Sequence, residues 1–476
     1  MRKLARLICS AAATTLAFTT AAHAASPSPV SEKLERIDHI IVIYLENWSF
    51  DSLFFDFPGA DSGGSAKFIY PQVDANGQPY AQLPLVLNAG KPDPRFPGPL
   101  PNAPFDVGDY GIGLTDFVGD LVHRFYQEQA QIDGGKMDRF AQVSDAGGET
   151  MGYFGVGAMG STFLWQLAKD YTLADAFFHP AFGGSFLNHQ WLVCACTPTY
   201  PDAPTSLQAV LDANGNLVKD GPVTPDFYAV NTMRSVFLHA PTDTDPTKLL
   251  PSQKHVNIGD LLDREGVSWA WYAGGYDNAV AGTPDKLFQF HHQPFAMYAN
   301  NAPANATLAN SAVGNAKTEA HRARHLKDFN KLYDAIDRGT LEHVVWYKPL
   351  GEFNQHPGYA NLKQGDDHLR EVMGHIMNSP IWHNSVVIIT YDEHGGWWDH
   401  VAPPVDPVHH RSDRWGPGSR VPAIIASPFA KRGYIDHQQY DQTAILKLIE
   451  DRYELPRLGD RDAAQADLWR SLNLGR

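Results

Sequence analysis

An apolar run near the C-terminal end of the chain places the strongest constraint on its fold. Residues 386–391, Val-Val-Ile-Ile-Thr-Tyr, lead directly into residues 392–396, Asp-Glu-His-Gly-Gly. A short apolar run that is bounded by polar residues and glycine predicts a strand buried on both faces. In an open α/β sheet, ligands bind at the carboxyl ends of the strands, which is where Asp392 and Glu393 stand. Two adjacent carboxylates repel each other unless a cation holds them, so we expect a metal site here rather than a pair of solvated acids.

A second apolar run, near the N-terminus, ends in the same way. Residues 40–45, Ile-Ile-Val-Ile-Tyr-Leu, run into Glu46 and Asn47. Together with Asp392 and Glu393, these two residues form an oxygen-only ligand set. Such a set suits one divalent ion, Mg²⁺, Ca²⁺ or Mn²⁺, although Zn²⁺ also accepts carboxylate ligands. Because the two runs lie near opposite ends of the chain, their meeting would make everything between them part of one catalytic unit.

The first 24 residues predict a secretory signal peptide. Residues 2–6 contain three basic side chains, residues 7–22 are largely apolar, and residues 22–24, Ala-His-Ala, form a cleavage signal. Two adjacent arginines are absent, so we expect the general export route rather than the twin-arginine route. The rest of the sequence contains no apolar run long enough to span a bilayer. We therefore expect a periplasmic or secreted protein without a transmembrane segment.

The balance of charge limits the classes of partner. The chain contains 53 acidic and 38 basic residues, which gives a formal net charge of −15. Such a surface disfavours nucleic acid and anionic membranes as bulk partners. An anionic substrate, whether a small phosphorylated compound or a phospholipid, would need a local positive site, and a metal ion can supply one. No segment indicates a protein partner.

The order of predicted elements indicates the fold class. Residues 25–476 predict a single catalytic domain, with loop or lid insertions near 56–113 and 197–255 that are rich in Pro, Asn and either Gly or Asp. We expect further strands near residues 171–178, 266–272, 344–347 and 421–426, and helices near 115–125, 161–168, 322–338, 369–376 and 445–453. This alternation predicts an α/β fold, with a large, mostly parallel central sheet, helices on both faces and a smaller lid of loops and helices.

Two cysteines, Cys194 and Cys196, follow the expected leader. A disulfide across so short a spacing would be strained, and two small buried thiols fit the apolar surroundings about as well. A zinc site would need more cysteines or histidines than the neighbouring His189 supplies. Both pairing states therefore stay open.

The stretch 181–189, Ala-Phe-Gly-Gly-Ser-Phe-Leu-Asn-His, contains a candidate nucleophile. It follows a predicted strand and opens a helix, so Ser185 would lie beside the backbone N–H groups and the dipole that favour a phosphate group. A nearby divalent cation would lower the pKa of this serine and replace the base of a Ser-His-Asp triad. The stretch is not the G-x-S-x-G turn of esterases, because Phe186 and Leu187 follow the serine. Taken alone, Ser185 also fits an ordinary helix N-cap, and the nearby carboxylates favour the nucleophile.

Four motifs resemble those of the bacterial phosphoesterase family, which unites phospholipases C with secreted respiratory-burst-inhibiting acid phosphatases. They are residues 46–51 (Glu-Asn-Trp-Ser-Phe-Asp), 134–138 (Gly-Gly-Lys-Met-Asp), 354–357 (Asn-Gln-His-Pro) and 391–401 (Tyr-Asp-Glu-His-Gly-Gly-Trp-Trp-Asp-His-Val). The likeness is greatest to the acid phosphatases. It implies an alkaline-phosphatase-like fold in which Glu46, Asn47, Asp392 and Glu393 hold one metal ion that Ser185 also contacts. The family's phosphate pocket is lined by histidines that match His123, His291, His292 and His356.

The resemblance leads to an expected function. We expect a secreted, metal-dependent acid phosphatase that hydrolyses phosphate monoesters through a phosphoserine formed on Ser185. The alternative is a phospholipase C acting on the head groups of phospholipids, and a third possibility is a secreted binding protein with a degenerate site. The phospholipase branch usually has extra C-terminal domains and a threonine nucleophile, which favours the phosphatase. The chain also departs from the common motif Glu-Asn-Arg-Ser-Phe-Asp-His, because Trp48 and Ser52 replace its arginine and histidine.

Overall fold

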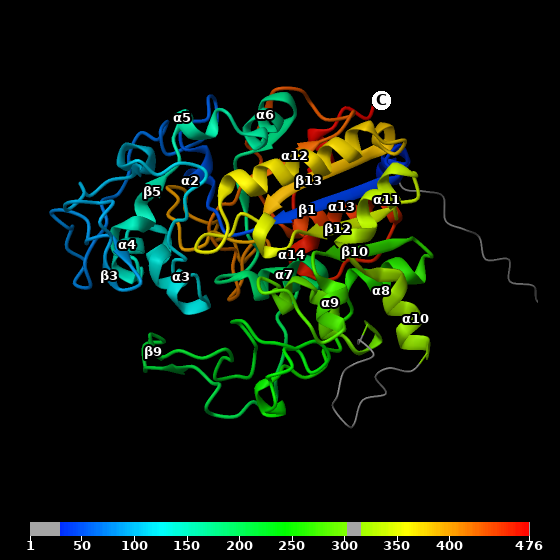
Figure 1. The fold of residues 1–476 in the computed structure, drawn as a ribbon, viewed down its shortest axis with the longest axis horizontal. Helices are drawn as coiled ribbons and strands as arrows, with labels where there is room; N and C mark the ends of the chain where they lie inside the picture. The colour runs from blue at the N-terminus through cyan, green and yellow to red at the C-terminus, as the bar shows by residue number, and fades with distance from the viewer. Residues whose placement is uncertain (1–28, 302–315, 476) are drawn as a thin grey trace, which may run out of the picture.

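The structure, a computed structural model, describes residues 29–301 and 316–475 (Figure 1). The expected signal peptide, residues 1–24, lies outside the described residues. Within the described ranges, no helix combines the length and the apolar composition that a membrane crossing requires.

An eight-stranded sheet forms the centre of the molecule. Across the sheet its strands are β11 (Leu326–Asp328), β10 (Trp269–Ala273), β12 (Val344–Lys348), β1 (His39–Leu45), β13 (Ser385–Tyr391), β14 (Ala423–Ala426), β6 (Thr172–Ala174) and β15 (Tyr434–Asp436). Only β14 runs antiparallel to its neighbours, β13 and β6. The α/β fold with a mostly parallel sheet is therefore confirmed.

Helices cover both faces of this sheet, as its unbroken apolar strands require. All seven residues of β1 and all seven of β13 are buried. On one face, α12 (Leu362–Asn378) packs with α6 (Phe163–Asp170) and α11 (Leu332–Asp337). On the other, α13 (Thr443–Tyr453) packs with α1 (Pro29–Leu34), α7 (Ser185–Cys194) and α14 (Asp460–Ala463). The two helix layers keep water from both sides of the central strands.

Two largely irregular regions lie at the carboxyl ends of the central strands (Figure 1). The first holds α2 (Phe50–Phe54), β2 (Leu87–Asn88), β3 (Lys91–Pro92), β4 (Phe105–Asp106), α3 (Phe125–Ile132), α4 (Phe140–Val143), β5 (Gly152–Tyr153) and α5 (Val156–Met159). The second holds the hairpin of β8 (Val210–Leu211) and β9 (Leu217–Lys219). Beside the sheet stand β7 (Phe177–Phe178), α8 (Ile258–Arg264), α9 (Tyr276–Val280), α10 (Ala316–His325) and β16 (Tyr440–Asp441).

The helix expected over residues 115–125 is wrong. The chain is not helical there, and α3 begins only at Phe125. The backbone N–H of Gly119 donates to Glu149 Oε1 at 3.0 Å, and that of Val122 donates to Asp145 Oδ1 at 2.8 Å. These distant carboxylates take the N–H groups that a helix would have bonded internally.

The single helix expected over residues 322–338 is also wrong. Helix α10 ends at His325, β11 pairs with β10 in parallel, and a separate helix, α11, starts at Leu332. The free edge of the sheet takes Leu326 into register with Trp271, and this pairing overrides the helical spacing of the apolar residues. The Asp328 side chain then accepts from the Asn330 N–H and starts the next helical turn.

Two smaller differences concern other elements. The strand expected over residues 171–178 is split into β6 and β7, and β14 begins at Ala423, just after Pro422. Cys194 and Cys196 form a disulfide across the end of α7. The residue between them, Ala195, has a φ of 48° at the C-cap of the helix.

Candidate active site

The two strands that end in carboxylates are neighbours. β1 and β13 pair in parallel over their whole lengths, and Leu45 stands opposite Tyr391. The residues that follow each strand therefore meet at one edge of the sheet. They are buried, with exposed fractions of at most 1%: Glu46, Asn47, Asp392 and Glu393.

The backbone around these acids follows a path that few residues allow. Asn47 has a φ of 65°, a left-handed conformation that non-glycine residues adopt mainly where the surroundings force it. Gly395 has a φ of 63°, and a Cβ atom there would lie 2.3 Å from the Asn47 carbonyl oxygen. At Gly396, with a φ of 77°, a Cβ atom would lie 2.7 Å from the Val122 carbonyl oxygen. The turn that follows the two carboxylates is tight, and it needs glycine at both positions.

Ser185 is the first residue of α7, as predicted, and its hydroxyl faces the acids. Its Oγ lies 3.3 Å from Asn47 Oδ1, 3.4 Å from Glu393 Oε1 and 3.5 Å from Glu46 Oε2. A hydroxyl has one proton, so it can donate to only one of these three oxygens at a time. The helix is ten residues long, so its positive dipole end and its first unbonded N–H groups lie at the turn that contains Ser185.

His356 and His123 stand beside Asn47. The Asn47 Nδ2 atom lies 2.8 Å from His356 Nε2 and 3.5 Å from His123 Nε2. The Nδ1 atoms face carbonyl oxygens, of Pro357 for His356 and of Leu121 for His123, and each at 2.5 Å. A carbonyl only accepts, so both Nδ1 atoms carry protons and both Nε2 atoms face the site. This arrangement turns the Asn47 amide oxygen toward Ser185.

His292 and His291, the other two expected pocket histidines, lie on another side of the acids. His292 Nε2 lies 2.5 Å from Glu46 Oε1, and the ring centroids of His291 and His292 are 4.7 Å apart. Burial lowers the pKa of His291 and lowers that of His292 to about 4, with the charge of Glu46 acting against the shift in both. All four predicted pocket histidines thus lie around the predicted ligand set.

Two site residues were missed from the sequence, Lys348 and His189. Lys348 is fully buried at the end of β12, with its Nζ 2.7 Å from Glu46 Oε1 and 3.3 Å from Asp392 Oδ2. A lysine closing a buried strand, Val-Val-Trp-Tyr-Lys, was the available signal. His189 lies one helical turn after Ser185, whose carbonyl accepts from its Nδ1 at 2.7 Å. The spacing of four residues on the predicted helix could have indicated it.

The three carboxyl groups differ in how easily they hold charge. Burial would raise the pKa of Glu46, but the charges of His292 and Lys348 hold it well below its usual value. Burial and the charge of Glu46 raise the pKa of Asp392 to about 7, although Lys348 opposes the shift. Burial and the charge of Asp392 raise the pKa of Glu393 well above its usual value. Without a further cation, therefore, the site has more carboxylate than Lys348 can neutralise.

The donor set fits a divalent metal ion. Oxygen atoms of three carboxyl groups, one amide and one hydroxyl converge, and the hydroxyl proton can satisfy only one of its oxygen contacts. Hard divalent cations take such oxygen ligands, and a cation would relieve the repulsion that raises the pKa values of the two adjacent acids. The residues that would hold it are those expected from the sequence: Glu46, Asn47, Ser185, Asp392 and Glu393.

A buried carboxylate fixes the loop in front of the nucleophile. Glu128, on α3, accepts from the Gly183 N–H at 2.6 Å through Oε2. Its Oε1 accepts from His179 Nε2 at 2.9 Å and from the Ser419 N–H and hydroxyl at 2.9 and 3.1 Å. His179 Nδ1 in turn donates to the Ala181 carbonyl at 2.8 Å. Because both nitrogens of His179 face acceptors, the ring is a cation that pairs with Glu128.

The two positions that depart from the family motif belong to the core. The Trp48 Nε1–H donates to the Gln355 carbonyl at 2.9 Å, and its ring stacks on Trp397 with centroids 4.8 Å apart. The Ser52 hydroxyl donates to the Ser49 carbonyl at 2.8 Å. The hydrogen bonds and ring contacts of these two side chains go to other residues than the expected ligands and pocket histidines, so their roles here are structural.

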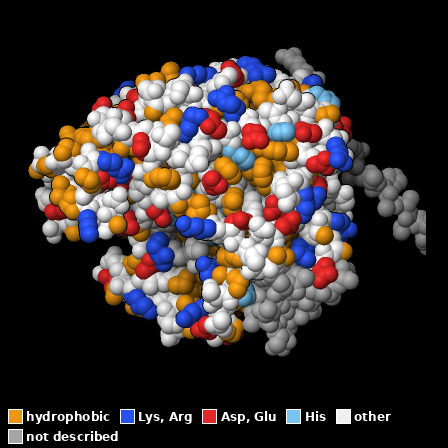
Figure 2. Space-filling model, viewed as in Figure 1, with side chains coloured by type: hydrophobic (Ala, Val, Ile, Leu, Met, Phe, Trp, Pro, Cys, Tyr) orange, Lys and Arg blue, Asp and Glu red, His pale blue; other side chains and the backbone are white. Residues whose placement is uncertain are grey.

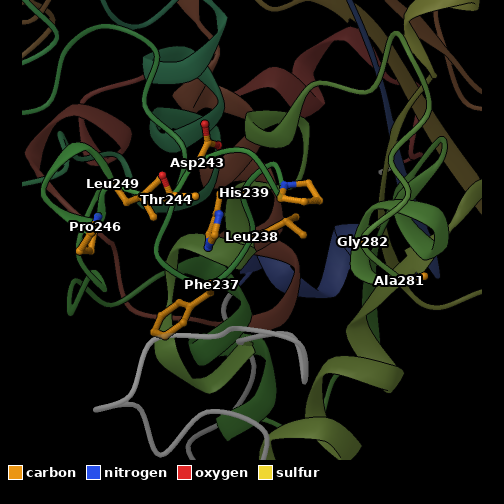
Figure 3. Close-up of a pocket in the computed structure, with 10 residues that line it drawn as sticks. Phe237, Leu238, His239, Asp243, Thr244, Pro246, Leu249, Ala281 and Gly282 are labelled. Atoms are coloured by element: carbon orange, nitrogen blue, oxygen red, sulfur yellow. The ribbon is translucent and has the colours of Figure 1, made fainter.

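Two surface pockets lie away from these residues. One, of about 510 Å³, is formed by residues 237–249 with Ala281 and Gly282 (Figure 3). Another, of about 440 Å³, lies between α3 and the β8–β9 hairpin, where Figure 2 shows an indentation at the edge of the molecule. Neither contains an expected ligand or pocket histidine. The chemistry of the converging acids, rather than the size of a cavity, therefore identifies the site.

Curated proteins with similar sequences include bacterial phospholipases C. The phospholipase C B of Mycobacterium tuberculosis is 24% identical over 487 residues, which cover 95% of this chain and 80% of that protein. The non-hemolytic phospholipase C of Burkholderia pseudomallei is 25% identical over 449 residues, 88% of this chain and 55% of that protein. The chain thus spans little more than half of the length of the Burkholderia enzyme.

Solved structures resemble the chain only distantly. A Vibrio parahaemolyticus protein in the alkaline phosphatase superfamily has 10% identity and a TM-score of 0.34, over 66% of this chain and 65% of that one. At this score the fold class is supported by the strand order described above and not by the superposition. A model of the phosphoesterase family, in contrast, matches residues 37–456, a range that begins before β1 and ends after α13. The expected family is therefore confirmed: the chain belongs to the phosphoesterase family.

Proposed function

We propose that this chain is a phosphoric ester hydrolase that acts on phosphate monoesters through a phosphoserine formed on Ser185. The observation that carries the proposal is the position of Ser185 Oγ. It stands at the N-terminus of α7 and within 3.5 Å of oxygens from Glu46, Asn47 and Glu393. A hydroxyl among carboxylates and helix N–H groups suits phosphoryl transfer.

The residues of the site can each take a part in the reaction. Ser185 Oγ attacks phosphorus in line with the leaving oxygen and passes its proton to Glu393 Oε1, 3.4 Å away. A divalent cation, when bound, would neutralise phosphoryl oxygens and lower the pKa of the serine. His123 Nε2 faces the site, and the cationic form of the ring donates its Nε2 proton to the leaving oxygen while its Nδ1–H stays bonded to the Leu121 carbonyl. Water then attacks phosphorus and gives a proton to His123 Nε2, while Glu393 returns its proton to the departing Ser185 Oγ, so that both groups regain their starting forms.

The burial of the site favours a monoester. Ser185 is 5% exposed, and the acids around it are more deeply buried. His123 is more open, with a side chain that is 21% exposed next to the exposed Asp120. A monoester has one substituent on phosphorus, which could leave toward His123. A diester has a second substituent, which would have to displace buried side chains.

A phospholipase C activity is the second candidate, because curated relatives are phospholipases C. Hydrolysis of p-nitrophenyl phosphate and of p-nitrophenylphosphorylcholine by the same preparation distinguishes the two. We expect the monoester to have the higher kcat/KM, and the reverse order would favour the phospholipase. Turnover of neither compound, with metal bound and the fold intact, would support a binding protein instead.

We also propose that the protein is exported, on the basis of residues 1–24 alone. Expression of the full chain in a bacterial host tests this. We expect the periplasmic or secreted protein to begin at Ala25, which N-terminal sequencing would show.

A further inference from the structure

A second cluster of potential metal ligands lies on the edge of the sheet, outside the site described above. Asp263 comes from α8, and His321 and His325 come from α10. The two histidines are four residues apart, so they lie on the same face of the helix, one turn apart. One ligand atom from each of the three side chains lies within 4.8 Å of the other two.

The distances in this cluster are close to those of a metal centre. His325 Nε2 lies 3.4 Å from Asp263 Oδ1, and His321 Nε2 lies 2.7 Å from Asp263 Oδ2. Nitrogen and oxygen ligands about 2.0–2.1 Å from a tetrahedral Zn²⁺ ion are roughly 3.3 Å apart. The His325 separation already has this value, and a small outward movement of the partly exposed His321 would bring its nitrogen to the same spacing.

The remaining ring nitrogens are held as they are in metal-ligating histidines. His325 Nδ1 lies 2.8 Å from the Trp269 carbonyl oxygen, and His321 Nδ1 lies 2.7 Å from Asn301 Oδ1. Histidine ligands of metals commonly donate their second N–H to a carbonyl or carboxylate, which fixes the tautomer and points the other nitrogen at the ion. The carboxylate is fixed as well, because the Trp269 Nε1–H donates to Asp263 Oδ1 at 2.9 Å.

The contact between His325 and Asp263 leaves room for a cation. The Trp269 carbonyl can only accept, so the His325 Nδ1 carries a proton, and its Nε2 faces Asp263 Oδ1 at 3.4 Å. A divalent cation between these two atoms would take the place of a proton on Nε2 and would be attracted to both the nitrogen and the carboxylate.

The cluster is separate from the active site. The register of the sheet sets Trp269 opposite Val344 and Val344 opposite Ile40. Ile40 stands near the start of β1, whereas Glu46 follows its end. At ~3.3 Å per residue, these six residues amount to roughly 20 Å along the strand. A metal ion at the cluster could therefore not take part in the chemistry at Ser185.

We propose that Asp263, His321 and His325 form a structural binding site for Zn²⁺ or a similar borderline divalent cation. Two imidazoles and a carboxylate suit Zn²⁺, and water can fill a fourth position. The ion joins α8 to α10 and so holds the residues that lead into β11 at the edge of the sheet. Because it binds the folded chain, it raises the stability of the protein without changing the reaction.

Equilibrium dialysis of the full-length protein against Zn²⁺, followed by metal analysis, tests the proposal. We expect wild type to bind about one more equivalent than the double variant His321→Ala/His325→Ala, with a Tm that rises with Zn²⁺ in wild type beyond the rise in the variant. Hydrolysis of p-nitrophenyl phosphate should be equal in the two proteins. His375→Ala is the matched control, because His375 makes a surface ion pair with Asp337 at 2.8 Å and should leave Zn²⁺ stoichiometry unchanged.

A second probe covers a double variant that fails to fold. Asp263→Asn can still accept from the Trp269 N–H but lacks the charge, so it should fold and lose the same equivalent of Zn²⁺. Co²⁺ should give the visible absorption of a tetrahedral site in wild type, and this absorption should be lost in Asp263→Asn. Equal Zn²⁺ stoichiometry in wild type and Asp263→Asn, or an unchanged Co²⁺ spectrum, would overturn the proposal and leave the cluster as an ion pair between two helices.

Discussion

Replacing Glu128 with glutamine should both destabilise the protein and slow its chemistry. The carboxylate accepts four hydrogen bonds, three on Oε1 and one, from Gly183, on Oε2. Glutamine keeps the shape but has one oxygen and one NH₂ group. If the glutamine oxygen takes the place of Oε1, its NH₂ group faces the Gly183 N–H, so two donors oppose each other. In the opposite orientation the NH₂ group faces the donors of His179 and Ser419. The first arrangement costs less free energy, because it loses one hydrogen bond instead of three. It pushes away Gly183, which lies two positions before Ser185.

The magnitude follows from breaking a buried ion pair. Removal of one partner of such a pair typically costs ~3–5 kcal/mol, and we expect a loss of this size in Glu128→Gln. A shift of order 1 Å at a reacting group can reduce kcat by ~100-fold, so we expect a fall of about 10- to 100-fold in kcat with a smaller change in KM. Glu265→Gln, at the exposed C-cap of α8, is the matched control and should change neither quantity.

The pH dependence of the lost stability tests whether the ion pair between Glu128 and His179 is its cause. Burial opposes the charge of Glu128, but His179 and His394 lower its pKa to about 2. The stability that this carboxylate contributes is therefore present above the pKa of an unfolded glutamate, and it is lost as the pH falls toward 2. Burial opposes the charge of His179 as well, but Glu128 raises its pKa, so its contribution is complete below ~6.5 and is lost as pH rises through the raised value. Urea denaturation of wild type and variant should therefore differ most between about pH 4.5 and 6.5. A difference below ~1 kcal/mol in that window would refute the reasoning.

Three further predictions concern the reaction itself. Ser185→Ala should abolish turnover of p-nitrophenyl phosphate with little change in Tm, and substantial remaining activity would mean that water attacks phosphorus directly. Asp392→Ala or Glu393→Ala should lose both bound metal and activity. By elemental analysis, wild type should contain about one equivalent of metal at this site. Full activity of metal-free wild type would contradict this prediction. A pH profile of kcat/KM should be bell-shaped with its maximum on the acid side of neutrality. Burial lowers the pKa values of His291 and His356, so pocket charge is lost as pH rises. Burial and the charge of Glu46 raise the pKa of Asp392 to about 7, so proton binding competes with metal binding as pH falls. An alkaline optimum would point instead to attack by hydroxide.

Local patterns in the sequence were sufficient to predict the central strands and the candidate metal ligands at their ends. The apolar runs at residues 40–45 and 386–391 form β1 and β13, because a fully apolar segment of this length is stable only when both of its faces are covered. The carboxylates that end these runs meet for a topological reason, since neighbouring parallel strands end at the same edge of a sheet. The two glycines after Glu393 likewise fixed the tight turn, because a Cβ atom would collide with the backbone at either position.

Tertiary structure decided what depends on contacts between distant segments. Residues 115–124 have helical spacing, but Glu149 and Asp145 capture the Gly119 and Val122 N–H groups, and no local pattern announces those partners. Residues 326–328 became a strand because the edge of the sheet was open to them. Lys348 and Glu128 acquire their roles only when the fold buries them against charges that lie far away in the sequence, Glu46 and Asp392 for the lysine and His179 for the glutamate. Sequence thus determined which groups were available at each strand end, whereas burial and long-range pairing determined which of them act together, because the energy of a buried charge depends on its neighbours in space.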